Sequence, residues 1–169
     1  SSSPALGSGG AVYVGSAAGD NRLYCVNADG SPGWSYQAGD VIRTSPAIGS
    51  DGAVYVGSLD NCLYRLDSDG VLGWSYSFGG TIYSPPVVDC DGRVYAAAFS
   101  GALHALRADG KLDWSYRTGA SVRGAPAWDR YGRVYAAGGS SAALFAVDSA
   151  AVFAWSYVTG GTLYGSPVI

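Results

Sequence analysis

The tripeptide Trp-Ser-Tyr occurs four times at nearly constant spacing, and this repeat constrains the fold more than any other feature of the chain. Its tryptophans are Trp34, Trp74, Trp114 and Trp155, which lie 40, 40 and 41 residues apart. The unit that starts at Ser45 reads SPAIGSDGAVYVGSLDNCLYRLDSDGVLGWSYSFGGTIYS, and the other units superpose on it. A period of about 40 residues with several short β segments is typical of a β-propeller blade.

Each unit contains four short apolar segments separated by turn-forming residues. In the second unit they are Ser45–Ile48, Ala53–Ser58, Cys62–Asp67 and Gly73–Tyr76, with Asp-Gly or Asp-Asn pairs between them. Such pairs tolerate the positive φ of hairpin turns, so the unit predicts a meander of four antiparallel strands.

A proline recurs in the first segment of every unit and in a fifth, incomplete one. These prolines are Pro4, Pro46, Pro86, Pro126 and Pro167. Because proline cannot donate to a strand ladder, this strand is predicted to be the edge that lines the central channel. The tryptophan strand is then the outer edge, and we expect each indole to wedge against the next blade.

The composition excludes several classes of protein. The chain has 26 glycines, no glutamate and a formal net charge of −3. This balance favours an all-β fold and gives no basic surface for nucleic acid. No apolar run is long enough for a membrane helix. The three cysteines, Cys25, Cys62 and Cys90, stand at non-equivalent positions, so we expect buried free thiols rather than disulfides.

The unit SPAIGSDGAVYVGS followed by LYRLDSDGVLGWSY resembles the PQQ-like repeats of quinoprotein alcohol dehydrogenase-like propellers, over essentially the whole chain. That family's tryptophan docking motif has an Asp, two residues, Thr-Gly and three residues before the tryptophan. Here the segment from Asp67 to Gly70 is one residue shorter and lacks the threonine. Arg107 replaces the aspartate in the third unit, and Ala151 replaces the glycine in the fourth.

Residues 1–169 are therefore predicted to form one propeller repeat array of about four blades. The blades are 3–44, 45–84, 85–124 and 125–165, and 166–169 is the inner strand of a next blade. The family that the repeat resembles mostly uses seven or eight blades, within the range that propellers adopt. Three arrangements stay open: part of a larger ring, two copies that complete an eight-bladed ring, or four blades that close alone.

The resemblance also implies an enzyme, but the residues that its chemistry needs are missing. PQQ-dependent dehydrogenases hold the quinone over a calcium ion with an Asp base, a Glu and an Asn, and usually carry a disulfide of adjacent cysteines. The chain has no Glu and no Cys-Cys pair, and Asn21, Asn27 and Asn61 stand at turn-like positions. The Asp-rich turns also lack the Glu of an EF-hand, and no nucleophile elbow or phosphate loop occurs. We expect no catalytic residue, cofactor or metal ligand.

Two single residues depart from the repeat. His104 replaces an aromatic residue of the third strand, and we expect it to pack rather than to catalyse or bind metal. Trp128 lies in an inner strand, where it plugs the channel or fills space left by small neighbours, with ligand stacking as the alternative.

An ordered variation precedes the inner strands: Arg43, Tyr83, Arg123 and Tyr164 alternate from unit to unit. At this position they could ring the channel mouth, and Arg and Tyr are enriched in binding hot spots. They are candidate residues for binding an acidic peptide, a carboxylate or a partner loop. The alternative is that they stack on one another as cation–π neighbours and serve only packing.

These features favour a non-catalytic scaffold for protein–protein interaction, because the function of a rigid propeller resides in its loops. The resemblance extends to a propeller scaffold of outer-membrane assembly and to sensor domains of bacterial kinases. A small-ligand or anion sensor at the channel mouth is the alternative, and a fragment of a PQQ-dependent dehydrogenase is the second. The expected partner is a protein or further blades, including a second copy. The compartment stays open, since the family is often periplasmic whereas unpaired cysteines favour a reducing environment.

Overall fold

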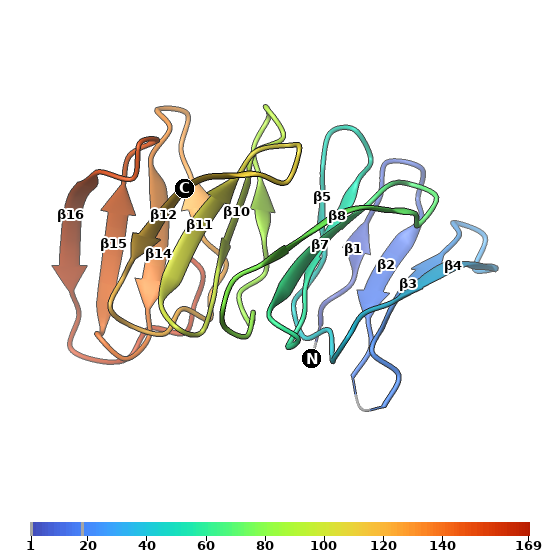
Figure 1. Cartoon of the computed structure of the whole chain (residues 1–169), viewed down its shortest axis with the longest axis horizontal. Helices are drawn as coiled ribbons and strands as arrows, with labels where there is room; N and C mark the ends of the chain where they lie inside the picture. Colours follow the sequence, from blue (N-terminus) through green and yellow to red (C-terminus); the bar gives the residue numbers. More distant parts are fainter. Residues whose placement is uncertain (1, 18) are drawn as a thin grey trace.

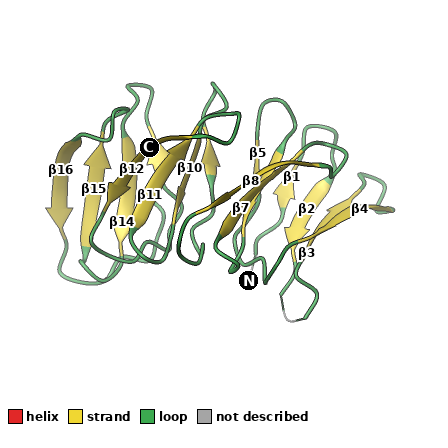
Figure 2. Cartoon of the chain, viewed as in Figure 1, coloured by secondary structure: helices red, strands yellow, loops and turns green. Residues whose placement is uncertain are grey.

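Every regular element of the protein is a β-strand in the computed structural model, which describes residues 2–17 and 19–169 (Figure 2). The strands form four antiparallel sheets, each with its four strands in the order of the sequence. Figure 1 shows the four sheets side by side along the molecule, from blue to red. The predicted all-β architecture of four-stranded blades is therefore confirmed. No helix long and apolar enough to span a membrane is found among the described residues.

The same four strand positions recur in every blade. The first blade contains β1 (Ala5–Leu6), β2 (Val12–Gly15), β3 (Arg22–Val26) and β4 (Pro32–Gln37). The second contains β5 (Ala47–Ile48), β6 (Val54–Gly57), β7 (Cys62–Leu66) and β8 (Leu72–Ser77). The third contains β9 (Val87–Val88), β10 (Val94–Ala97), β11 (Ala102–Leu106) and β12 (Leu112–Arg117). The fourth contains β13 (Ala127–Trp128), β14 (Val134–Gly138), β15 (Ala143–Val147) and β16 (Phe153–Val158).

The first and last strands of each blade are its two edges, as the prolines and tryptophans predict. The first strand is shorter than predicted: β5 begins only after Pro46, whose missing N–H cannot join the ladder. β1 lies against β5 and β5 against β9, so the first strands gather on the inner side of the array.

The hairpin turns have the geometry that their sequences predict. Gly52 has a φ of 80°, and its N–H donates to the carbonyl of Gly49 at 3.0 Å. The Asp51 carboxylate accepts the N–H of Ala53 at 3.1 Å, which closes the turn from the side chain. Asn61 also adopts a positive φ, 72°, where an Asp-Asn pair joins β6 to β7.

The hydrophobic core lies between neighbouring blades rather than within one sheet. The cluster between the second and third blades contains Leu63 and Ile82 on one side and Val94 and Leu106 on the other, all fully buried. Each such side chain contributes about 2 kcal/mol through removal of apolar surface from water. This packing joins consecutive repeats into one array.

The tryptophans of the first two blades anchor each blade on the next. The indole N–H of Trp34 donates to the carbonyl of Ser68 at 2.8 Å, and that of Trp74 donates to the carbonyl of Ala108 at 2.9 Å. Gly110 packs beneath Trp74, and a β-carbon there would lie 2.7 Å from the indole. The predicted wedge between blades is therefore present at these positions.

The other two tryptophans differ from this pattern. Trp114 is buried, but its indole N–H has no acceptor within the described part of the chain. Ala151, with a φ of 62°, takes the place beneath Trp114 that Gly110 takes beneath Trp74. It packs against the buried cluster between the third and fourth blades that contains Trp114. Trp155 lies on the last strand of the last blade and is 40% exposed. One packing role for all four tryptophans, as the repeat predicts, therefore holds only in part.

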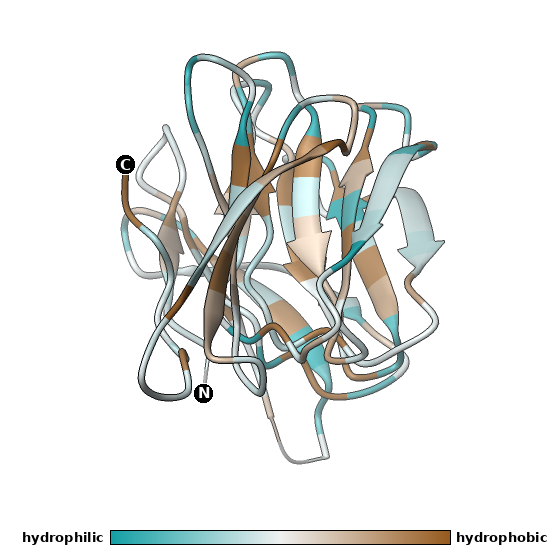
Figure 3. Cartoon of the chain, turned by 90° about the vertical axis from the view of Figure 1, so that its left-hand side faces the viewer, coloured by the Kyte–Doolittle hydropathy of each residue, from teal (hydrophilic) through white to brown (hydrophobic). Residues whose placement is uncertain are grey.

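The described residues form an open array with one unpaired face at each end. Figure 3 looks at the molecule from the side of the fourth blade. On this blade Phe153, Tyr157 and Val158 are exposed together with Trp155. Residues 166–169 form no strand, although the N–H of Ala125 donates to the Ser166 hydroxyl at 2.9 Å, as Ser3 does to Ser45 at 3.0 Å. Among the described residues no second strand pairs with this predicted inner strand.

Candidate functional site

The candidate residues before the inner strands meet at Arg123. The carbon of its guanidinium lies 5.7 Å from the ring centre of Tyr83, 5.7 Å from that of Tyr164 and 5.0 Å from that of Phe99. All three distances are within the range of cation–π attraction. These four residues are called the Arg123 cluster below.

Backbone contacts of the linkers hold this cluster in place. Val122 is fully buried and pairs with Gly138, which fixes the chain directly before Arg123. The N–H of Phe99 donates to the carbonyl of Thr81 at 2.8 Å, which ties the β10–β11 turn to the linker that leads to Tyr83. The rings of Phe99 and Tyr83 then meet edge to face, with their centres 5.5 Å apart.

The structure brings together three of the four predicted residues and adds one. Arg43 is exposed, and its side chain makes no hydrogen bond or ion pair with the described residues. The repeat pattern does not point to Phe99, because this residue lies in a turn rather than before an inner strand. Its alignment with Leu59 in the second unit, a smaller apolar residue, is the signal that could have identified it.

The Arg123 cluster presents a positive charge inside an aromatic surface. Arg123 itself is exposed, as are Phe99 and Tyr164, and no carboxylate of the described residues forms an ion pair with it. The stacking that the packing alternative predicts is present. A guanidinium stacked on rings still directs its N–H groups outward in its own plane, where a carboxylate can accept two of them. Binding stays a prediction.

A second polar region lies between the second and third blades and is called the His104 cavity below. It measures about 370 Å³. Its lining residues are Phe78, Gly79, Ser100, Ala102, His104, Ser115, Tyr116 and Arg117. The His104 ring is nine-tenths buried and stacks on Phe78 with ring centres 4.5 Å apart. Burial lowers the pKa of His104 to about 4, so its imidazole is neutral at pH 7.

The other residues that stand out in the sequence are Trp128 and the three cysteines. Trp128 is half-buried and packs against the core between the third and fourth blades. Cys25 is buried, Cys62 is half-buried and Cys90 is exposed, and none of them forms a disulfide. The expectation of buried thiols is therefore correct for Cys25 and wrong for Cys90.

The described residues do not fit a calcium–quinone site. No three His, Cys, Asp or Glu side chains among them lie close enough together to hold a metal ion. Asn21 and Asn61 occupy turn positions with φ of 54° and 72°, and the Asn27 amide donates to the Ser31 hydroxyl at 3.0 Å. These asparagines thus belong to local turn structure.

Comparison with solved structures places this fold among propellers. BamB from Moraxella catarrhalis superposes with a TM-score of 0.83 at 18% identity, over 98% of this chain and 54% of that chain. Quinohemoprotein alcohol dehydrogenase from Comamonas testosteroni gives 0.77 at 17% identity, over 93% of this chain and 34% of that chain. A chain of the mitotic checkpoint complex gives 0.83 at 11% identity, over 96% of this chain and 52% of that chain. The chain thus spans about half the length of BamB.

A search of curated proteins finds no match. The sequence family described as outer membrane protein assembly factor BamB matches residues 1–79 and, in an overlapping second match, residues 19–166. These two matches together cover nearly the whole chain, and the repeat and the blades agree with them. The chain belongs to this family of PQQ-like repeat propellers.

Proposed function

We propose that this chain is part of a non-catalytic propeller scaffold that binds an acidic segment of a partner protein at the Arg123 cluster. The observation that carries the proposal is the exposed guanidinium of Arg123 among the rings of Tyr83, Phe99 and Tyr164. Arginine and aromatic residues dominate binding hot spots, because they combine large contact area with directed hydrogen bonds. Membership of a family named for an assembly factor supports a role in a protein complex.

The non-catalytic part of the proposal rests on chemistry. Acid–base or nucleophilic catalysis needs a titratable side chain beside a partner that activates it. The chain has one histidine and no glutamate, and its histidine is buried against Phe78. The Arg123 cluster contains a cation and aromatic rings, which suit recognition rather than bond breaking.

Binding of a labelled peptide tests the proposal. The probe is an Asp-rich peptide with one aromatic residue, and its Asn-for-Asp counterpart is the neutral comparison. We expect fluorescence anisotropy to show binding of the acidic peptide only, and Arg123→Gln to weaken it about tenfold through loss of charged hydrogen bonds. The matched control is Arg130→Gln, because Arg130 also stacks on a tyrosine, Tyr131, at 4.9 Å outside the cluster.

Two results would overturn the proposal. If Arg123→Gln lowers the unfolding temperature markedly and Arg130→Gln does not, the cluster serves packing. If the neutral peptide binds as well as the acidic one, the charge of Arg123 has no part in recognition. The small-anion alternative is distinguished by competition, since in that case acetate displaces the peptide fully.

A further inference from the structure

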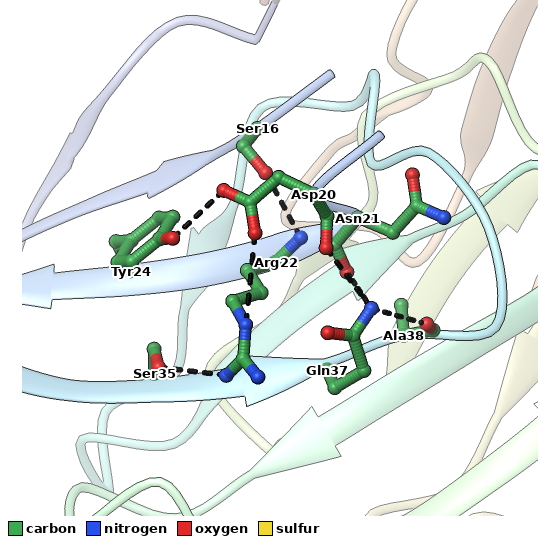
Figure 4. A network of polar contacts seen from close by, with 8 residues as sticks. All are labelled: Ser16, Asp20, Asn21, Arg22, Tyr24, Ser35, Gln37 and Ala38. Atoms are coloured by element: carbon green, nitrogen blue, oxygen red, sulfur yellow. Dashed lines mark hydrogen bonds and ion pairs between the residues drawn. The ribbon is translucent and has the colours of Figure 1, made fainter. Parts of the chain in front are cut away.

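In the second, third and fourth blades the turn before the third strand meets the linker from the preceding tryptophan strand, and the first blade has the same turn without such a linker. In the first blade the hydroxyl of Tyr24 donates to the Asp20 carboxylate at 2.7 Å, and Arg22 lies 3.6 Å from the same carboxylate (Figure 4). In the second blade the hydroxyl of Tyr64 donates to the Asp60 carboxylate at 2.6 Å. Two successive repeats thus place an anionic group at the same point.

The carboxylate of the second blade organises its whole corner. Besides the Tyr64 hydroxyl, Asp60 accepts the backbone N–H of Gly39 at 2.8 Å and that of Cys62 at 2.9 Å. Hydrogen bonds to an ionised acceptor are roughly twice as strong as neutral ones. Asp60 therefore ties the linker, the turn and the third strand together.

Both members of this pair are replaced in the third blade. Ser100 aligns with Asp60, and His104 aligns with Tyr64. The His104 cavity lies at this corner, and Gly79 and Ala102, which align with Gly39 and Cys62, line it. In the second blade Asp60 accepts the N–H groups of the two aligned residues. In the third blade the N–H groups of Gly79 and Ala102 have no acceptor among the described residues. The Nδ1 atom of His104 is also buried without a partner there.

A positive charge is added at the same corner. Arg117 aligns with Ser77 of the second blade, lines the cavity and forms no ion pair with a described carboxylate. The cavity thus gathers hydroxyl and guanidinium donors at the point where the earlier repeats hold an anion. The fourth blade differs: Phe145 takes this position, and a β-carbon on Gly138 would lie 2.7 Å from its ring, so an apolar ring fills the space.

We propose that the His104 cavity binds a carboxylate group, which takes the place that the Asp60 carboxylate holds in the second blade. The ligand is a small organic acid or the acidic side chain of a peptide. Arg117 and the Ser100 hydroxyl contact its oxygens, and the neutral imidazole of His104 packs beside it against Phe78. This site uses none of the residues of the Arg123 cluster, although Ser100 directly follows Phe99 in the β10–β11 turn.

The single histidine of the chain makes this proposal directly testable. The imidazole C–H signals in a carbon-13 NMR spectrum belong to His104 without further assignment. We expect acetate or succinate to shift these signals in a saturable way, whereas sodium chloride at equal ionic strength does not. A capped peptide with one Asp serves as the second probe. Tighter binding of the peptide than of the free acids identifies a protein segment as the ligand, and the reverse identifies a small acid.

Two variants take their residues from the second blade. Arg117→Ser is expected to weaken binding about tenfold, because it removes the only cationic donor of the cavity lining. Ser100→Asp is expected to abolish binding, because it restores an internal carboxylate. The Arg123→Gln variant keeps the histidine shift, so failure of the proposed function and failure of this site give different results.

The proposal is overturned if no saturable histidine shift occurs with either probe while circular dichroism shows folded protein. It is equally overturned if Arg117→Ser and Ser100→Asp bind like the unchanged chain. If Ser100→Asp unfolds, Ser100→Asp combined with His104→Tyr rebuilds the complete pair of the second blade. The binding of a carboxylate to that double variant is followed by the NMR signals of the Arg117 side chain. If the double variant still binds it, the proposal is also contradicted.

Discussion

The same residue type has different surroundings from one repeat to the next, and Trp114 is the clearest case. In the first two blades a glycine in the left-handed region lies beneath the tryptophan, and the indole N–H reaches a backbone carbonyl. Ala151 carries a β-carbon at this place and a φ of 62°, a conformation that costs a non-glycine residue about 1 kcal/mol. The buried indole N–H of Trp114 is left without a described acceptor.

Ala151→Gly is therefore expected to stabilise the chain by about 1 to 2 kcal/mol, because it relieves the backbone and lets the indole bind a carbonyl. The free energy of unfolding in urea measures the change. The reverse substitution, Gly110→Ala, is the matched control and is expected to destabilise, since its β-carbon would approach Trp74 to 2.7 Å. An unchanged or lower stability of Ala151→Gly contradicts this account.

The burial of His104 makes folding depend on pH. Its pKa is about 4 in the folded chain, against an ordinary value of 6.5. The unfolded chain therefore takes up a proton as the pH falls through about 6.5, and the folded chain does so only near 4. This contribution to stability is complete above about pH 6.5 and is lost as the pH falls, by about 2 kcal/mol between about pH 7 and about pH 5.

His104→Phe, which copies Phe145 of the fourth blade, is expected to remove that loss. Urea unfolding of both proteins at the two pH values gives the comparison, since the aspartates titrate equally in each. Parallel pH dependence of the two proteins would show that His104 is not responsible.

At the scale of the element, the aspartates at the ends of the inner strands fix the first hairpin of the third and fourth blades. Asp129 accepts the N–H groups of Tyr131 and Arg133 at 2.8 and 2.9 Å and the hydroxyl of Tyr135 at 2.8 Å. Glycine stands at this point in the first two blades, as in Gly49. The later hairpins therefore use a carboxylate at this position, whereas the hairpin of the second blade uses that of Asp51, two residues further along.

Asp129→Ala is expected to lower the free energy of unfolding by about 2 kcal/mol, because one buried carboxylate accepts three hydrogen bonds. Asp91→Ala, at an exposed turn position, is the control and is expected to change stability by less than about 0.5 kcal/mol. Equal effects of the two substitutions would show that the carboxylate network of Asp129 does not support the hairpin. Chemical denaturation measures both.

Strands and turns were predictable because period, turn residues and prolines all recur in every unit. The outcome at single positions was less predictable, because it depends on contacts between units. The sequence places Arg123 and Tyr83 one repeat apart, but the participation of Phe99 follows only from the distance between a turn and a linker. Likewise, alignment shows that His104 replaces a tyrosine, whereas the cavity appears only once Ser100 and Arg117 are seen beside it.

At the scale of the whole molecule, the array ends in complementary faces. Trp155 is exposed on the last blade, and nothing lies within 4 Å of the place where a β-carbon on Gly30 of the first blade would stand. Gly30 aligns with Gly110, which receives Trp74. The exposed indole of Trp155 therefore fits a blade that presents such a glycine, either a further blade of a larger ring or the first blade of a second copy.

If a second copy supplies that blade, light scattering on a sizing column gives twice the mass of 17.3 kDa for this chain. Trp155→Ala is expected to shift the species towards the single mass, because it removes the indole that enters the facing blade. Tyr131→Ala, which removes an exposed aromatic residue outside this face, is the control. A folded species of single mass for the unchanged chain would show that two copies do not share a ring.

The tryptophan anchors also set an order of events during synthesis. Trp34 and Trp74 each bond a carbonyl 34 residues further along the chain. These two hydrogen bonds consequently form only after nearly a whole further repeat has left the ribosome. Until then each of these two blades lacks its tryptophan hydrogen bond to the next blade, and it is more accessible to chaperones and proteases during that interval.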